Sequence, residues 1–155
     1  MNEKLSSASP RYEAMIQLLR TADTLWNSSH VLFARWDLSP SQFNVLNLLF
    51  DLPAGMSQID LSRALLMHRS NLTGLVDRLE KRGFVQRRDT PEDRRSYCVV
   101  LTTDGRKLME EIVPLYYQAS EEVWGNLSAK RAAELKSALA EVCANAERIA
   151  AKLTK

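Results

Sequence analysis

The side chains between residues 68 and 81 are of the types that bind bases and phosphates, and they recur at helical spacing. The amide of Asn71 can pair with an adenine edge, and the guanidinium of Arg69 can pair with a guanine edge or a phosphate. The hydroxyl groups of Ser70 and Thr73 can donate to either partner. The pattern therefore predicts a helix whose outer face enters a DNA major groove. Its candidate contacts are His68, Arg69, Ser70, Asn71, Thr73, Arg78 and Lys81.

The alternative is that these polar residues form an ordinary solvated helix face. Net charge does not separate the two interpretations, because the chain carries only +2 at pH 7. Residues 57–106 hold 10 Lys and Arg against 7 Asp and Glu, whereas the remainder holds 11 against 12. The positions of the cations are therefore more informative than their number. Lys81, Arg87 and Arg88 are placed to add phosphate contacts that do not depend on base sequence.

A second basic group lies between two β-rich runs, residues 84–88 and 97–101. The segment between these runs is rich in charged residues and is predicted to be an exposed loop at the tip of a hairpin. Arg94 and Arg95 in this loop suit the narrow minor groove of DNA, where negative potential is concentrated. Asp93 beside them would repel DNA, so its presence favours a salt bridge that orients an arginine.

Short helices are needed on either side to hold the groove-facing helix, which is predicted over residues 69–82. Ser39 and Gln42 form a capping box that starts one helix, and Ser57 caps a second. Gly83 stands where a left-handed residue ends the groove-facing helix before the hairpin. Together these elements predict a winged helix-turn-helix over residues 39–103, called the winged module below. The inward residues of its groove-facing helix are predicted to be Leu72, Leu75, Val76 and Leu79.

The two ends of the chain carry apolar stripes that are too long for the winged module to bury. Residues 11–36 and 104–153 are predicted to form long helices, with apolar residues at spacings of three and four. These helices would form a dimerisation domain with a second chain, since soluble monomers rarely expose large apolar patches. A bundle within one chain is the alternative. The predicted dimer residues are Met15, Leu18, Leu135, Leu139, Val142 and Ile149. The expected fold is thus mainly α with a small β-hairpin wing.

Several functional classes find no support in the sequence. No apolar run approaches the roughly 20 residues of a membrane span, and the N-terminus lacks the apolar core of a secretory signal, so we expect a cytoplasmic protein. Cys98 and Cys143 belong to no metal-binding cluster, so neither a metal nor a cofactor is expected. With no glycine-rich phosphate loop, and only His30 and His68 as histidines, an enzyme is not expected.

Two segments carry a family resemblance. DRRSYCVVLTTDG, residues 93–105, matches the D-x-R-x-x-x-hydrophobic-x-L-T-x-x-G pattern of the MarR family of bacterial transcription regulators. NLTGLVDRLEKRGFV, residues 71–85, is similar to the recognition helix of that family. The resemblance implies a homodimer with one winged module per subunit, bound to an approximate palindrome. It also implies that Arg95 is the wing arginine and Asp93 its salt-bridge partner.

The sequence departs from the family pattern at two positions. Leu66 occupies the turn where many helix-turn-helix proteins have glycine, and His68 stands where serine often caps the recognition helix. His68 is therefore expected to cap less well, or to touch DNA itself. Some members of the family sense oxidants through a cysteine near the N-terminus, and Cys98 and Cys143 lie elsewhere.

The resemblance further implies a repressor whose DNA affinity falls when a small, often phenolic, ligand enters a pocket between the dimer helices and the winged module. Aromatic residues and one histidine on these helices could hold such a ligand. An aromatic stripe at helical spacing can equally be plain core. An architectural or protein-interaction module without sequence-specific DNA readout is the alternative function. The candidate ligand residues are Trp26, His30, Trp36 and Tyr116.

Overall fold

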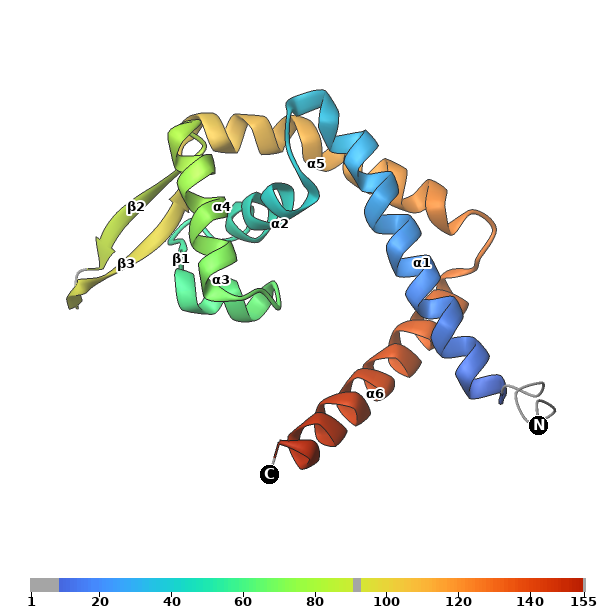
Figure 1. The fold of residues 1–155 in the computed structure, drawn as a ribbon. Coiled ribbons are helices and arrows are strands. Elements are labelled where there is room, and N and C mark those ends of the chain that lie inside the picture. The colour runs from blue at the N-terminus through green and yellow to red at the C-terminus, as the bar shows by residue number, and fades with distance from the viewer. Residues whose placement is uncertain (1–8, 91–92, 155) are drawn as a thin grey trace. The chain divides into compact units, whose positions relative to one another are not determined.

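Helices account for most of the chain in the computed structural model, which describes residues 9–90 and 93–154, except for the side chains of residues 90 and 93–96. A small antiparallel sheet interrupts the helices, as predicted (Figure 1). The elements in order are α1 (Pro10–Phe33), the 3-10 turn η1 (Ala34–Trp36), α2 (Pro40–Phe50), β1 (Met56–Ser57), α3 (Gln58–Ala64), α4 (Arg69–Lys81), β2 (Val85–Thr90), β3 (Asp93–Leu101), α5 (Thr103–Trp124) and α6 (Ala129–Leu153). No described helix is long and apolar enough to cross a membrane.

The chain divides into two compact units, Met1–Tyr116 and Tyr117–Lys155. The first unit contains α1, the winged module and the first part of α5. The second contains the end of α5 and the whole of α6.

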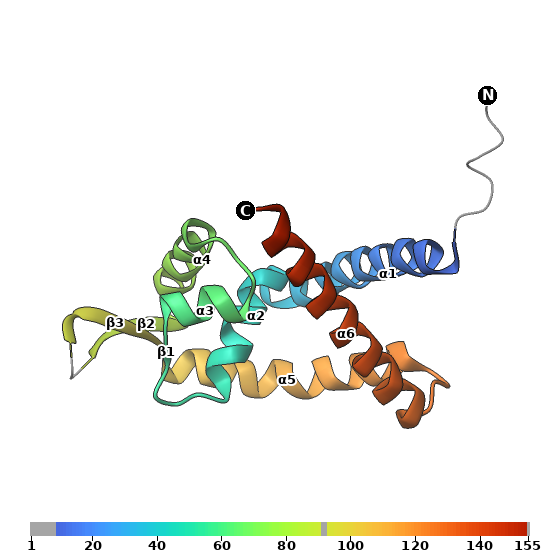
Figure 2. The ribbon, with the colours of Figure 1, turned by 90° about the horizontal axis from the view of Figure 1, so that it is seen from below.

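The sheet has the strand order β1-β3-β2. β1 was not predicted, because its two residues pair with β3 through the backbone and carry no alternating pattern. The wing strands are also longer than predicted, since residues 89–90 and 93–96 were expected to lie in a loop. Charged residues favoured a loop, but the backbone groups of these residues are paired between the strands, and that pairing does not depend on apolar side chains. Both views show the hairpin of β2 and β3 projecting beyond α3 and α4 (Figures 1 and 2).

Helix starts follow the predicted capping signals. Ser39 accepts from the backbone N–H of Gln42, whose side chain accepts from the backbone N–H of Ser39, so the capping box is complete. The side chains of Ser57 and Ser128 accept from the third residue of α3 and of α6. The first helix is shorter than predicted: α1 ends at Phe33, and η1 replaces its expected last turn.

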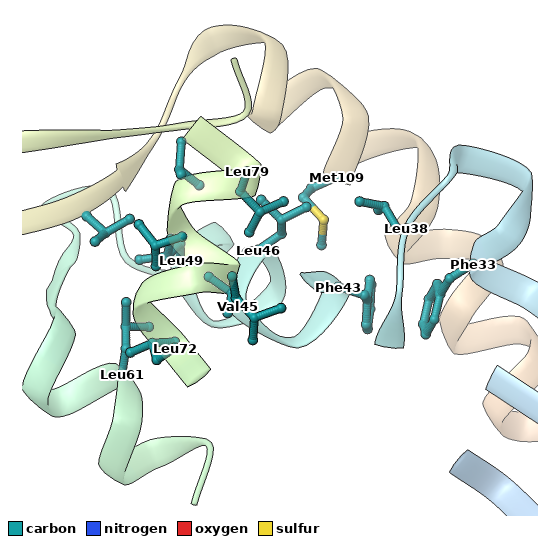
Figure 3. Packing of buried hydrophobic residues seen from close by; sticks show 14 of the residues in the cluster. Phe33, Leu38, Phe43, Val45, Leu46, Leu49, Leu61, Leu72, Leu79 and Met109 are labelled. Carbon is teal, nitrogen blue, oxygen red and sulfur yellow. The ribbon is translucent and has the colours of Figure 1, made fainter. Parts of the chain in front are cut away.

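The core lies in the first unit, where α2, α4 and β3 meet the end of α1 and the start of α5 (Figure 3). Phe33 stacks on Phe43 with ring centroids 4.1 Å apart, which joins α1 to α2. Gly105 allows α5 to start close to the wing, because a Cβ at this position would lie 2.0 Å from the Phe84 carbonyl oxygen. The largest fully buried side chains are those of Phe33, Phe43, Val45, Leu46, Leu49, Leu61, Leu72, Val76, Leu79, Val85, Met109 and Ile112.

Candidate nucleic-acid interface

The two faces of α4 differ in exposure as the sequence predicts. Its apolar side packs into the core, with Leu72, Val76 and Leu79 fully buried and Leu75 nearly so. The opposite side is open to solvent along the length of the helix. A helix held by its inner face in this way presents its outer face without reorganisation. The exposed candidate contacts on α4 and its cap are His68, Arg69, Ser70, Asn71, Thr73, Arg78 and Lys81.

His68 caps α4, but through a long hydrogen bond. Its Nδ1 accepts from the backbone N–H of Ser70 at 3.4 Å and lies 2.7 Å from the Ser70 hydroxyl oxygen. The first interaction is near the limit for a hydrogen bond, as expected for a residue that replaces the usual serine. The Thr73 hydroxyl donates to the carbonyl of Arg69 at 3.0 Å. In the free protein, Thr73 therefore offers its oxygen mainly as an acceptor.

The turn from α3 to α4 adopts a left-handed conformation at Leu66. Leu66 has φ 51° and is 89% exposed. A glycine would adopt this φ without strain, whereas a leucine does not. The backbone N–H of Met67 donates to the carbonyl of Ser62 at 2.9 Å, and that of Leu66 donates to Arg63 at 3.2 Å. These two bonds form a Schellman motif, which fixes where α4 begins.

The other end of α4 closes on the predicted glycine. Gly83 has φ 77°, and its N–H donates to the carbonyl of Glu80 at 2.9 Å. The N–H of Phe84 donates to the carbonyl of Leu79 at 3.0 Å, which completes a second Schellman motif. The Thr102 hydroxyl donates to the Gly83 carbonyl at 2.6 Å. The end of the groove-facing helix is thereby joined to the base of the wing.

Arg87, which was predicted to contact phosphate, is paired with carboxylates of the protein itself. Its guanidinium forms ion pairs with Asp77 and Glu80 of α4, and its backbone N–H donates to Glu80 Oε1 at 2.9 Å. Desolvation favours a lower pKa for Arg87, but the hydrogen bond that Arg87 donates to Asp77 and the charge of Glu80 outweigh it, so the pKa of Arg87 is raised. Arg87 therefore joins the wing to α4.

The same cluster extends to α3. The Arg87 guanidinium lies 5.5 Å from the centroid of the Tyr97 ring, and the Tyr97 hydroxyl donates to Gln58 Oε1 at 2.8 Å. Arg87 is on β2, Tyr97 on β3 and Gln58 on α3, so these contacts join both wing strands to two helices. Sequence reasoning missed this network, because its members are 7 to 39 positions apart and match no local pattern. Arg88, the next residue, is exposed.

The wing residues predicted to enter the minor groove have only their backbones described. Asp93, Arg94 and Arg95 lie at the start of β3, directly after the hairpin tip. Their side chains fall outside the described part of the chain. The expected ion pair between Asp93 and Arg95 therefore stays a prediction.

The four candidate ligand residues fall into two groups. Trp26 and His30 form an edge-to-face contact on α1, with ring centroids 6.0 Å apart. Trp36 donates from its indole nitrogen to Glu111 Oε1 at 2.8 Å, and Tyr116 packs against Phe43 with centroids 4.7 Å apart. Ten residues of helix separate Trp26 from Trp36, or about 15 Å. Tyr116 thus takes part in the core, as the alternative interpretation held.

A further question is whether the described residues could hold a metal ion. Among them, the structure places no three His, Cys, Asp or Glu side chains together in a way that could do so. Cys98 is half-buried and its thiol lies 3.6 Å from the carbonyl of Ala54, whereas Cys143 is exposed on α6.

Comparison with known sequences places the winged module in a family. Residues 38–97 match the model of the MarR family. The chain is 34% identical over 100 residues to the transcriptional regulator HosA of Escherichia coli, across 61% of this chain and 73% of HosA. It is 35% identical over 97 residues to the transcriptional repressor YetL of Bacillus subtilis, across 62% of this chain but only 58% of YetL.

Solved structures share the fold at lower identity. A DNA complex of MepR from S. aureus has a TM-score of 0.75 at 20% identity, covering 86% of this chain and 97% of MepR. CouR from Rhodococcus jostii, bound to p-coumaroyl-CoA, has a TM-score of 0.79 at 22% identity, covering 88% of this chain and 95% of CouR. The motif at residues 93–105, the exposed face of α4 and the match to HosA agree, and the chain belongs to the MarR family of transcription regulators.

Proposed function

We propose that this protein is a homodimeric repressor that binds an approximately palindromic operator and leaves it when a small aromatic ligand binds. In this proposal α4 enters the major groove of each half-site, and Arg94 and Arg95 at the hairpin tip reach the adjacent minor groove. The protein acts as a regulator and not as an enzyme. The winged module, residues 39–103, reads DNA, and residues 11–36 and 104–153 form the dimer.

The exposed outer face of α4 is the observation that carries the proposal. Its inner face is fixed by buried leucines and a valine, its start follows the Schellman turn that ends α3, and its own C-terminal end is closed by a second Schellman turn. A helix fixed at both ends holds Asn71 and Arg69 at constant positions, which base readout requires. The DNA complex of the structural relative MepR supports the same use of the fold.

The dimer is supported by apolar side chains that the single chain leaves uncovered. On α1, Met15 is 48% exposed and Leu18 is 37% exposed. On α6, Leu135, Val142 and Ile149 are between 43% and 57% exposed. Stripes of this length on two helices provide enough apolar surface for a second copy to cover, and burying them would stabilise the assembly.

The effector is proposed to be an aromatic acid or thioester with a phenolic ring. The relative CouR is bound to p-coumaroyl-CoA, which carries such a ring. In this chain Trp26 and His30 already form an aromatic contact on an exposed part of α1, where a flat ring could stack. Repression is proposed because the relative YetL is a transcriptional repressor.

Selection of bound sites from random DNA, followed by affinity measurements at fixed salt, tests the proposal. We expect a palindrome with half-sites about one helical turn apart, bound at least a thousandfold more tightly than scrambled DNA. Asn71→Ala should weaken binding to the palindrome by about tenfold to a hundredfold, because the bidentate contact to a base is lost.

Asn126→Ala is the matched control, since Asn126 is an exposed asparagine outside the winged module and should leave affinity unchanged. Equal affinity of the wild-type protein for palindromic and scrambled DNA would contradict the proposal. That result would favour an architectural module instead. Addition of p-coumaroyl-CoA or simple phenolic acids should release the palindrome, and failure of all of them would remove the ligand from the proposal.

A further inference from the structure

Arg82 joins the end of the groove-facing helix to the end of α1. It is the residue directly after α4, and its guanidinium donates to the carbonyl oxygens of Trp36 and Asp37. The bond from Nη2 to the Trp36 carbonyl is 3.0 Å long. These carbonyls lie 45 and 46 positions earlier in the chain and belong to η1 and its cap. All of these residues belong to the first compact unit.

The end of η1 is suited to receive an arginine. The last carbonyls of a helix have no intrahelical donor, so they need a partner from elsewhere. Asp37 closes η1 in the left-handed region, with φ 52°, which ends the helical run and leaves adjacent carbonyls at its terminus. A planar guanidinium can donate to two such acceptors at once, whereas a lysine ammonium is a single point charge.

The carbonyl bonds, and not the ion pair, hold Arg82 in place. Its Nη2 lies 3.8 Å from the Asp37 carboxylate, but that carboxylate is 98% exposed and its attraction is screened by water. The Arg82 side chain is only 29% exposed and lies over the Phe84 ring, 4.9 Å from the ring centroid. A guanidinium packed and hydrogen-bonded in this way has little freedom to reach DNA.

Trp36 extends the contact to a third helix. Its backbone carbonyl accepts from Arg82, while its indole nitrogen donates to Glu111 on α5 at 2.8 Å. The end of α4 is therefore linked through one residue to both α1 and α5. These are the two helices of this unit that the proposed function assigns to the dimer.

We infer that Arg82 is a positioning residue that fixes the angle of α4 to the dimer helices and thereby sets the half-site spacing that the protein accepts. The inference rests on the proposed function, because spacing has meaning only for a dimer on a palindrome. Loss of Arg82 leaves the core, both Schellman turns and every proposed base-contacting side chain of α4 in place. The winged module is then held to α1 and α5 by core packing alone, so it can tilt more easily and follow half-sites at other separations.

The experiment measures affinity for the selected palindrome and for versions with one base pair inserted or removed between the half-sites. Each change moves a half-site along and around the DNA axis, and the wild-type protein should lose about tenfold or more in affinity. We call this loss of affinity the spacing penalty. Arg82→Gln should reduce the spacing penalty to less than about threefold, because the variant should bind the altered sites almost as tightly as the original palindrome. Arg82→Lys should behave like Arg82→Gln, since it keeps the charge but not the paired donors.

Arg78→Gln is the matched control. Arg78 lies one turn earlier on α4, is exposed and is a proposed DNA contact, so its loss should weaken all sites by the same factor and leave the spacing penalty unchanged. A spacing penalty in Arg82→Gln equal to that of the wild type would overturn the inference, and so would full retention of the penalty by Arg82→Lys. A wild-type protein with no spacing penalty would instead overturn the proposed function, and the inference with it. Circular dichroism should show unchanged helix content in each variant.

Discussion

Helices α4 and α6 follow the same pattern in sequence and differ completely in burial. Both start after a capping residue, and both carry apolar residues at spacings of three and four. All four apolar residues that line the inner face of α4 are buried, whereas α6, every residue of which the structure describes, has no buried side chain. An amphipathic pattern therefore specifies a helix with one apolar face, but not which molecule covers that face.

The difference has an energetic meaning for each region. Burial of a leucine or valine side chain contributes about 1.5–3 kcal/mol, so the inner face of α4 stabilises the winged module within a single chain. On α6 the same kind of side chain contributes little until another surface covers it. If the proposed dimer is correct, the stability of α6 depends on protein concentration and that of α4 does not.

The largest expected effect comes from placing charge on the α6 seam, which is the apolar stripe formed by Leu135, Leu139, Val142 and Ile149. The double variant Leu139→Asp with Val142→Asp puts two carboxylates where the proposed dimer buries apolar groups, and it should be monomeric in sedimentation velocity experiments. Affinity for a palindrome should then fall by about a hundredfold or more, because the two winged modules no longer bind as a linked pair. α4 should keep its fold, since its core lies elsewhere.

The matched control is Ser137→Asp with Ala144→Asp, which adds the same charge to exposed positions on the opposite side of α6. That variant should stay dimeric and bind DNA like the wild type. A dimer of wild-type strength in the seam variant would show that α6 does not lie in the interface, and the contrast with α4 would need another explanation.

A smaller effect is expected from Arg87, which holds α4 to the wing. Arg87→Met leaves the carboxylates of Asp77 and Glu80 side by side without their cation. The Arg87 side chain is 23% exposed, so solvent screens part of the loss, and we expect a decrease of about 1–2 kcal/mol in the free energy of unfolding. Urea denaturation at a fixed protein concentration measures it.

A double-mutant cycle that combines Arg87→Met with Glu80→Gln measures the interaction between Arg87 and Glu80 separately from the contacts that each makes with other residues. The two substitutions should be less than additive by about 1 kcal/mol, because either one alone already breaks the ion pair. Arg88→Met is the control, since the neighbouring arginine is exposed and its loss should leave stability within about 0.5 kcal/mol. Strict additivity would mean that Arg87 stabilises the wing by some other route.

The parts of the fold that the sequence predicts are those with local causes. Ser39 and Ser57 bond to backbone groups three residues away, and Gly83 closes α4 by its own conformation. The inner face of α4 follows from the helical repeat. Each of these features is visible within one or two turns of chain, which is why the predictions were confirmed.

The features that were missed depend on segments far apart in the chain. Arg87 was expected to contact phosphate and no role was predicted for Arg82, but both bind groups of the protein itself. An exposed cation and a cation that bridges two elements look alike in sequence, because only the tertiary fold brings the acceptors near. β1 and the longer wing strands were missed for the same reason, since backbone pairing leaves no pattern in polar side chains.

The smallest predicted effect concerns Leu66, whose left-handed backbone strains the turn between α3 and α4. Its replacement tests whether the leucine side chain has a function that offsets this strain. The left-handed conformation costs an L-residue about 1–2 kcal/mol, and glycine recovers most of this while losing about 0.5–1 kcal/mol through its freer unfolded chain. Leu66→Gly should therefore raise the free energy of unfolding by up to about 1 kcal/mol, with a rise in Tm of roughly 2–4 °C. Gly83→Ala should do the opposite. Its φ is also positive and its Cβ would meet nothing within 4 Å, so conformation alone sets the cost.

Leu66→Gly and Gly83→Ala together distinguish the cost of the left-handed backbone from any contact that the Leu66 side chain makes with another molecule. If the Leu66 side chain serves only the fold of one chain, Leu66→Gly stabilises the protein and leaves DNA affinity unchanged, because an 89% exposed leucine has little in-chain packing to lose. A stabilised variant with weaker DNA binding would show that the exposed leucine contacts the DNA or a second molecule. Leu66 would then resemble the α6 seam, because it would be an apolar group whose partner lies outside the chain, retained there despite the strain that it places on the turn.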